Sequence, residues 1–162
     1  MPSNHLENAV LQYYDGIMRY FVYRIHDRIT AEDLTQETFY RFVRYAGRYD
    51  FSDDRQCRAY LYKIASNVCR DYYADSYPVE ELDENAPSGY DFSASDTSVV
   101  IEAALGKLPD EQREAAVLYY YGGFRVKEIA EIQNATVSAV KSRLKLARDT
   151  LRKILSSKEG LF

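Results

Sequence analysis

The sequence predicts an all-α fold: two small helical domains joined by a flexible acidic linker. Apolar residues recur at helical spacing near both ends of the chain, and only 7 glycines and 4 prolines occur among its 162 residues. Residues 75–97 instead combine prolines, small polar residues and acids, and they lose the hydrophobic period. We therefore expect domains at 1–74 and 98–162. No apolar run is long enough to enter a membrane and no secretory signal is recognisable, so a cytoplasmic location is expected.

The N-terminal domain is expected to be a helical bundle. Its first helix covers residues 11–25. The expected buried stripe there is Leu11, Tyr14, Ile17, Met18, Phe21, Val22 and Ile25. A second helix is expected to begin at Thr30, whose hydroxyl suits the N-cap position ahead of Glu32 and Asp33. Its predicted buried side is Leu34, Phe39, Phe42 and Val43.

The other side of this second helix is polar and has two interpretations. It carries Asp33, Gln36, Glu37, Tyr40, Arg41 and Arg44. One interpretation is a solvated face on which Glu37 and Arg41 form an i,i+4 ion pair. The other is a docking surface for a partner helix. Periodicity alone favours the solvated face.

A third helix over residues 56–73 carries two parallel rows of side chains. The predicted core row is Cys57, Leu61, Ile64, Ala65, Val68 and Tyr72. The second row, at about 100° per residue, is Gln56, Tyr60, Lys63, Asn67 and Arg70. Its aromatic, amide and basic groups can stack on unpaired bases, bond base edges and pair with phosphates. An ordinary amphipathic helix with a boundary tyrosine explains the row equally well. A short polar loop, 51–55, precedes it.

The C-terminal domain is predicted to contain a helix-turn-helix. One helix starts around Pro109 and stops at Gly122 and Gly123, and a short helix covers 126–132. Residues 133–135 form the turn, where Asn134 can adopt a positive φ. A last helix begins near Thr136, with its buried stripe at Val137, Val140, Leu144, Ala147, Leu151 and Ile154.

Beside that stripe the last helix carries aligned bases. They are Lys141, Lys145, Arg148 and Arg152, with Ser138 and Ser142 on the same exposed side. A basic second helix after a three-residue turn is the arrangement that reads the major groove of DNA. A terminal helix of a bundle is the alternative, and DNA binding is favoured because turn length, helix order and basic stripe agree.

Charge is divided into unlike blocks behind a net charge of −4. Residues 71–106 contain nine acidic and no basic residues, whereas residues 137–158 contain seven basic residues and the single acid Asp149. A basic block of this kind suits phosphate, although a solvated helix face is the commoner outcome.

Groups that carry catalysis or bind metals are scarce. The two cysteines, Cys57 and Cys69, and the two histidines lack metal-ligand spacing, and no phosphate-binding glycine loop or nucleophile elbow occurs. His26 lies beside Asp27 without a nucleophile. We therefore expect no catalytic residue, metal, cofactor or small-molecule substrate.

Five motifs in order resemble the sigma-70 family of bacterial RNA polymerase sigma factors. Residues 33–39 read DLTQETF, 58–67 read RAYLYKIASN, 105–113 read LGKLPDEQR, 127–130 read KEIA and 140–148 read VKSRLKLAR. The short length and two-part layout are similar to the extracytoplasmic-function (ECF) subgroup. The resemblance covers about residues 10–155, and it implies a transcription initiation factor that binds core polymerase and directs it to promoters.

The resemblance also implies roles for the N-terminal domain as region 2. The residues that would dock on the β′ clamp helices of core RNA polymerase are Asp33, Gln36, Glu37, Tyr40 and Arg41. The residues that would capture the unpaired minus-ten strand of promoter DNA are Phe51, Asp53, Asp54, Gln56, Tyr60, Lys63, Asn67 and Arg70. Tyr60 stands where relatives usually have tryptophan, so stacking is retained on a smaller ring.

The C-terminal domain resembles region 4. The residues implied to bind the minus-thirty-five element are Lys141, Ser142, Lys145 and Arg148, together with Ser138 and Arg125. This domain would also pack on the polymerase β flap, and the acidic linker would follow the RNA-exit path. Arg125 replaces a usual serine cap, Asn134 a turn glycine and Leu146 a frequent base. An anti-sigma factor is the further partner that the family implies.

Two other classes of function are weighed against this interpretation. A stand-alone helix-turn-helix regulator would bind duplex DNA without polymerase. A pure protein-interaction module would be insensitive to replacing Lys141 and Lys145, whereas a DNA reader would lose affinity and salt dependence.

Overall fold

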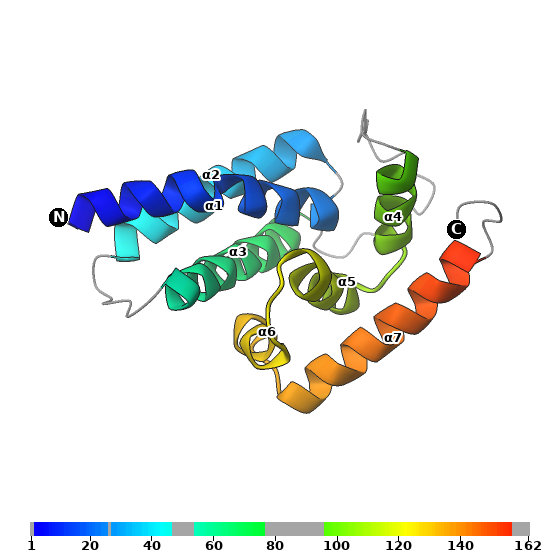
Figure 1. Cartoon of the computed structure of the whole chain (residues 1–162). Coiled ribbons are helices and arrows are strands. Elements are labelled where there is room, and N and C mark those ends of the chain that lie inside the picture. The colour runs from blue at the N-terminus through cyan, green and yellow to red at the C-terminus, as the bar shows by residue number, and fades with distance from the viewer. Residues whose placement is uncertain (1, 26, 47–53, 77–95, 157–162) are drawn as a thin grey trace. The chain divides into compact units, whose positions relative to one another are not determined.

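The computed structural model describes residues 2–25, 27–46, 54–76 and 96–156, and the described elements are all helical (Figure 1). The chain divides into two compact units, Met1–Gly89 (unit 1) and Tyr90–Phe162 (unit 2). Most of the predicted linker, 77–95, lies outside the described residues. Within the described helices, none is both long and apolar enough to cross a membrane.

Unit 1 consists of α1 (Pro2–Ile25), α2 (Arg28–Ala46) and α3 (Asp54–Ser76), and α2 packs against both of the others (Figure 1). Its core is mainly apolar and includes several aromatic rings. The most deeply buried side chains include Ile17, Phe21, Phe42, Leu61 and Val68. Gly16 lets α1 approach α3, because a Cβ at this position would lie 2.8 Å from the Tyr62 hydroxyl.

The start of α2 corrects a prediction. Asp27, not Thr30, caps this helix: its carboxylate accepts hydrogen bonds from the backbone N–H of Ile29 at 3.2 Å and from the Thr30 hydroxyl at 2.5 Å. An aspartate and a threonine are both good caps, and local sequence does not rank them here. The helix therefore begins at Arg28.

Two side chains predicted to be buried in unit 1 are exposed. Leu11 is 81% exposed because it lies about 200° around α1 from the buried Ala9. Val43 is 49% exposed because the buried face of α2 is centred on Ala31, Thr35 and Phe42. Thr35 can be buried because its hydroxyl donates to the Ala31 carbonyl oxygen at 2.7 Å.

Unit 2 contains five described elements. They are α4 (Asp96–Gly106), α5 (Asp110–Ala116), the π-helical η1 (Val117–Tyr121), α6 (Val126–Gln133) and α7 (Val137–Ser156). The helix α7 packs against α4, α5 and α6. Its buried positions Val140, Leu144 and Ala147 confirm the centre of the predicted stripe, whereas Val137, at the first turn, is 40% exposed.

The helix α4 is absent from the prediction and begins inside the last two residues of the predicted linker. Its apolar residues are not separated by a regular polar face. Moreover, Glu102 is a charged residue that the fold buries, at 2% exposure. Both features hide the helical period from sequence inspection.

The turns of unit 2 agree with the prediction. Asn134 has a φ of 53°, in the left-handed region, and connects α6 to α7. Thr136 caps α7, because its hydroxyl oxygen accepts a hydrogen bond from the Ala139 N–H at 3.0 Å. The N-cap of α6 is Arg125. Its guanidinium carries only hydrogen-bond donors, so it cannot accept a bond from the first N–H groups of the helix. The Glu128 carboxylate instead accepts from the Arg125 N–H at 2.9 Å and stabilises that helix start.

Candidate functional site

In unit 1, α3 presents the predicted mixed row to solvent. Gln56, Lys63, Asn67 and Arg70 are exposed and Tyr60 is half-buried. The row extends about 21 Å, at 1.5 Å per residue. The Tyr60 ring centroid lies 6.3 Å from that of Phe42 on α2. One side of Tyr60 is thus supported by the core, which holds the ring in place while part of it remains accessible.

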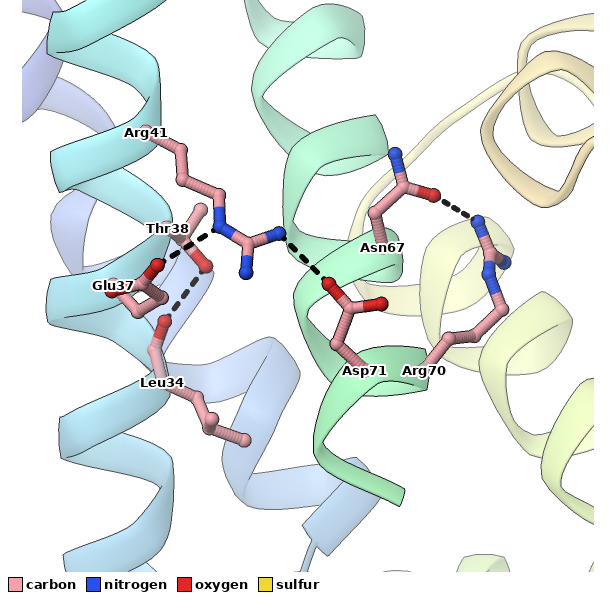
Figure 2. Close-up of polar contacts among 7 residues, drawn as sticks. All are labelled: Leu34, Glu37, Thr38, Arg41, Asn67, Arg70 and Asp71. Atoms are coloured by element: carbon pink, nitrogen blue, oxygen red, sulfur yellow. Dashed lines mark hydrogen bonds and ion pairs between the residues drawn. The ribbon is translucent and has the colours of Figure 1, made fainter. Parts of the chain in front are cut away.

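The two polar residues at the end of this row are bonded to each other (Figure 2). Arg70 donates from one guanidinium nitrogen to the Asn67 side-chain oxygen and from the other to the Ser66 hydroxyl, the latter at 2.9 Å. The guanidinium therefore lies along α3 toward its N-terminal end, where it places a fixed positive charge beside an amide. Such a pair suits a nucleotide, which offers a phosphate and a base edge together.

The beginning of the row is attached to α1. Asp54 is exposed at the first residue of α3, and its backbone oxygen accepts a hydrogen bond from the Tyr13 hydroxyl at 3.5 Å. Burial and the nearby Asp54 charge raise the pKa of the Cys57 thiol, so this side chain stays protonated near neutral pH. The predicted binding residues Phe51 and Asp53 lie outside the described residues.

The polar face of α2 contains the predicted docking residues. Asp33, Gln36, Glu37 and Tyr40 are exposed, as expected. The Arg41 guanidinium pairs with the Glu37 carboxylate at 2.9 Å and with the Asp71 carboxylate of α3 at 3.1 Å (Figure 2). Burial lowers the pKa of Arg41, but the bonds to Glu37 and Asp71 outweigh it and raise this pKa.

Asp71 is a residue of this surface that sequence reasoning assigns only to the acidic block. It follows Arg70 directly and connects the face of α2 with the end of the α3 row. The sequence contains no signal for this contact, since 30 residues separate Arg41 from Asp71.

In unit 2, the aligned bases of α7 lie on the surface, and we call Lys141, Lys145 and Arg148 the basic ridge. Lys141, Lys145 and Arg148 are exposed, and so are Ser138 and Ser142. The buried residues of α7 fix which side turns outward, so these cations form one solvent-facing line. Arg125, at the start of α6, is also exposed.

A buried polar network holds the helices that carry this ridge. Gln133, at the end of α6, donates to the Glu114 carboxylate of α5 at 2.9 Å and to the Glu111 backbone oxygen at 3.1 Å. Its side-chain oxygen accepts from Arg143 of α7 at 2.9 Å. Arg143 also pairs with the Glu111 carboxylate at 3.1 Å. Three helices thus meet at one amide.

Sequence reasoning overlooks this network. Gln133 is assigned to the turn and Arg143 to the basic block. One signal was available: Arg143 is basic but does not share the four-three spacing of Lys141, Lys145 and Arg148, so it occupies a different face of the helix.

An aromatic cluster adjoins the basic ridge. The Arg148 side chain donates to the Tyr120 hydroxyl at 3.3 Å, and this hydrogen bond raises the pKa of Arg148, which remains cationic. Tyr119 and Tyr120 contact edge to face, with ring centroids 5.0 Å apart. Both rings belong to the π-helical turn and are exposed.

The comparisons with known proteins match both units. The family model for sigma-70 region 2 matches residues 9–77, and that for sigma-70 region 4 matches residues 98–151. The RNA polymerase sigma factor YlaC of Bacillus subtilis is 30% identical over 158 residues, which cover 91% of this chain and 90% of that protein. The chain belongs to the sigma-70 family of RNA polymerase sigma factors, in the ECF subgroup.

Further relatives of this sigma factor agree in sequence and fold. The ECF RNA polymerase sigma factor BldN of Streptomyces coelicolor is 30% identical over 89% of this chain, which spans only 58% of the length of BldN. The fold resembles the sigma factor RpoE solved with the anti-sigma factor NepR from Bartonella quintana. In that comparison the TM-score is 0.71 and the identity 22%, covering 93% of this chain and 96% of the other.

Family membership decides between a sigma factor and a stand-alone helix-turn-helix regulator. The chain is a transcription initiation factor that binds core RNA polymerase and directs it to promoters, rather than a stand-alone regulator. Members of this family are initiation factors and not enzymes.

Proposed function

We propose that this sigma factor recognises promoters through two surfaces, the row on α3 and the ridge on α7. The observation that carries the proposal is the outward-facing ridge of Lys141, Lys145 and Arg148 on the second helix of a helix-turn-helix. Cations in this arrangement neutralise phosphates and reach base edges in the major groove. The ridge therefore binds the minus-thirty-five element as a duplex, with Ser138, Ser142 and Arg125 near its edges.

In the same proposal, α3 captures the unpaired minus-ten strand. Tyr60 provides a ring for stacking, and Gln56 and Asn67 provide amides that can bond base edges. Lys63 and Arg70 provide charges for the backbone. Phe51, Asp53 and Asp54, in and after the preceding loop, complete this surface. Stacking of about 1–3 kcal/mol per base offsets the cost of unpairing.

Core RNA polymerase docks on the exposed face of α2 in this proposal. Asp33, Gln36, Glu37 and Tyr40 contact the β′ clamp helices, and Arg41 contributes while tied to Glu37 and Asp71. Acidic and amide groups beside one fixed guanidinium suit a partner helix that carries both bases and acids. Unit 2 packs on the β flap.

The domain assignment follows from these roles. Residues 1–74 act as region 2 and residues 98–162 as region 4, with 75–97 as the linker along the RNA-exit path. The seven acids and no bases of residues 75–97 favour a basic channel. The protein works in the cytoplasm, where core polymerase is found, and uses no cofactor.

An anti-sigma factor is a further proposed partner. The sigma factor RpoE of similar fold was solved with such an inhibitor, NepR. A partner of this kind would copurify with the chain from its own cells and suppress its activity when added to core polymerase. If no cellular fraction suppresses activity, this part of the proposal is wrong.

In vitro transcription tests the two-surface assignment. Core polymerase with the full chain should initiate at defined sites on genomic DNA, and the aligned upstream sequences should contain two blocks. The double variant Lys141→Ala, Lys145→Ala should lose its dependence on the distal block. Lys153→Ala, an exposed base of α7 outside the ridge, is the charge control and should retain that dependence. Equal behaviour of both variants would contradict the ridge assignment.

A further inference from the structure

The π-helical turn η1 presents three consecutive tyrosines beside the basic ridge. Tyr119, Tyr120 and Tyr121 are 40%, 52% and 43% exposed, whereas Val117 and Leu118 at the start of the turn are buried. A π-helical turn contains one more residue than an α-helical turn closed by a hydrogen bond, and such turns are frequent at functional sites. Neither proposed promoter surface includes these three rings.

The backbone of η1 is fixed at its end by Gly122. The Gly122 N–H donates to the Val117 carbonyl oxygen at 3.0 Å. The Phe124 N–H donates to the Leu118 carbonyl oxygen, also at 3.0 Å. A Cβ at Gly122 would lie only 2.6 Å from this Leu118 oxygen, so glycine permits the close approach. The backbone that carries Tyr120 is thereby attached to the buried start of the turn.

The Tyr120 side chain has a contact on each side. The Tyr119 ring packs against its ring edge to face, with centroids 5.0 Å apart. The Tyr120 hydroxyl oxygen accepts a hydrogen bond from Nε of Arg148 at 3.3 Å. This bond joins residues that are 28 positions apart. A tyrosine of η1 therefore supports one cation of the basic ridge on α7.

Arg148 differs from the two lysines of the basic ridge in the shape of its cation. An ammonium group is a point charge with rotating donors, whereas a guanidinium is a planar fork that can donate two bonds to one phosphate. The bond from Nε to Tyr120 leaves the edge formed by the two Nη atoms for such an acceptor. The tyrosine hydroxyl thus selects which edge of the fork is offered to DNA.

We propose that Tyr120 is a positioning residue of the basic ridge, which orients the Arg148 guanidinium to bind one backbone phosphate through both Nη atoms. This inference rests on the proposed binding of duplex DNA by the ridge. Arg148 lies about 16 Å along α7 from its first residue, at 1.5 Å per residue. Base edges are contacted mainly by the N-terminal part of a recognition helix, so a cation this far along meets the phosphate backbone.

The benefit comes from ordering a long side chain before DNA binds. An exposed arginine samples many rotamers, and losing this freedom on binding reduces the affinity. The hydroxyl of Tyr120 restricts these rotamers already in the free protein. Its removal should weaken duplex binding about two- to tenfold, which is the range expected for immobilising one such side chain. The positive charge that releases counterions from DNA is retained.

Tyr120→Phe tests the proposal, because it removes the hydroxyl and keeps the ring. The probe is a labelled duplex containing the distal block of a promoter mapped by in vitro transcription, titrated with holoenzyme made from core polymerase and the full chain. We expect affinity to fall about two- to tenfold while the salt slope stays nearly constant. Tyr119→Phe removes an exposed hydroxyl from the same turn and should bind like the unaltered protein. Equal affinities of the two variants would overturn the proposal.

A double-mutant cycle shows whether Tyr120 acts through Arg148. Arg148→Ala alone should reduce the salt slope by about 1. In that background, Tyr120→Phe should have no further effect on affinity. An equal loss with and without Arg148 would mean that the hydroxyl supports the fold or contacts DNA itself, and it would overturn the positioning role.

A scrambled duplex tests the assignment to a phosphate. Because a phosphate carries no sequence information, Tyr120→Phe should weaken binding to a scrambled distal block by the same factor as binding to the promoter duplex. A loss confined to the promoter duplex would mean that Arg148 contacts a base and would overturn the phosphate assignment.

The double variant Lys141→Ala, Lys145→Ala reports separately on the proposed function. If it binds the promoter duplex as tightly as the unaltered protein, the ridge is not the DNA interface and both proposals are wrong. If it loses affinity and Tyr120→Phe does not, only the positioning role of Tyr120 is wrong.

Discussion

The two units join their helices with similar polar groups placed at different depths. In unit 1, Arg41 bridges α2 and α3 through Asp71, whose side chain is 61% exposed. In unit 2, Gln133 and Glu114 meet at 8% and 3% exposure. Exposed pairs contribute about 0–1 kcal/mol, whereas a buried polar group that loses its partner costs about 1–3 kcal/mol. The polar contacts that join α5, α6 and α7 therefore stabilise their relative position much more strongly than the exposed bridge stabilises that of α2 and α3.

This difference matches what each unit is proposed to bind. The major groove of a duplex is a rigid target, and a helix that reads it must keep its angle. An unpaired strand adapts to its protein, so a surface that binds it through stacking tolerates small adjustments. The α7 ridge accordingly consists of cations on a braced helix. The α3 row combines an aromatic ring with amides and bases. Its helix is joined to α2 by an exposed ion pair, which is easily replaced by other polar contacts.

The largest effect is expected from Gln133→Ala. This change removes the shared amide and leaves the buried Glu114 carboxylate with fewer hydrogen bonds, so unit 2 should lose about 2–3 kcal/mol of unfolding free energy. Chemical denaturation followed by circular dichroism measures it. Glu131→Ala, an exposed position on the same helix, is the control and should change stability by less than about 0.5 kcal/mol. Equal losses in the two variants would show that the network does not brace unit 2.

The second effect concerns Tyr60 on the adaptable surface. Tyr60→Ala should weaken binding of a minus-ten single strand by the polymerase holoenzyme by about 1–2 kcal/mol, because one stacking platform is lost. Tyr60→Phe retains the ring and should bind nearly as well. Fluorescence anisotropy with a labelled strand measures both. A phenylalanine variant as weak as the alanine variant would assign the effect to the hydroxyl and not to stacking.

The third effect concerns Lys145 on the braced surface. Lys145→Ala should reduce the slope of log affinity against log salt by about 1 for a minus-thirty-five duplex, since one phosphate contact is lost. Titrations of holoenzyme at several salt concentrations give the slope. Lys153→Ala removes the same charge from the same helix outside the ridge and should leave the slope nearly constant. A larger reduction of the slope in Lys153→Ala than in Lys145→Ala would mean that another face of α7 contacts DNA.

Local patterns predicted much of this architecture, and contacts between helices account for what they missed. The buried centre of α7 and the left-handed Asn134 follow from spacing and residue type alone. The helix α4 was missed because its buried side includes the charged residue Glu102, which interrupts the apolar period that would reveal a helix. The burial of Thr35 was not predicted, because it depends on a hydrogen bond from its hydroxyl that sequence spacing does not reveal.

The candidate surfaces show the same division. Exposure of the α3 row and the α7 ridge was predicted, because each row is defined by positions on a single helix. The partners of Arg41, Gln133 and Arg143 were not predicted, since each contact joins helices that are distant in sequence. Which nucleotide or subunit each residue contacts remains a proposal.

The smallest effect is expected from the exposed bridge of unit 1. A double-mutant cycle of Arg41→Ala and Asp71→Asn should give a coupling free energy below about 1 kcal/mol, because both side chains are solvated. The coupling should weaken further as salt is added. Denaturation of the four proteins measures it. Asp75→Asn, one turn further along α3, is the charge-matched control and should show no coupling to Arg41.

This small coupling can nevertheless matter for polymerase binding. Arg41 keeps its bond to Glu37 when Asp71 is neutralised, so Asp71→Asn should leave Arg41 on α2 but let the guanidinium move. Affinity for core polymerase should then change less than with Arg41→Ala, and Asp75→Asn should have no effect. If Asp71→Asn weakens polymerase binding as much as Arg41→Ala, the α3 end of the bridge is itself part of the docking surface. The α2 face would then extend onto α3, and the two functions of unit 1 would share residues at Asp71.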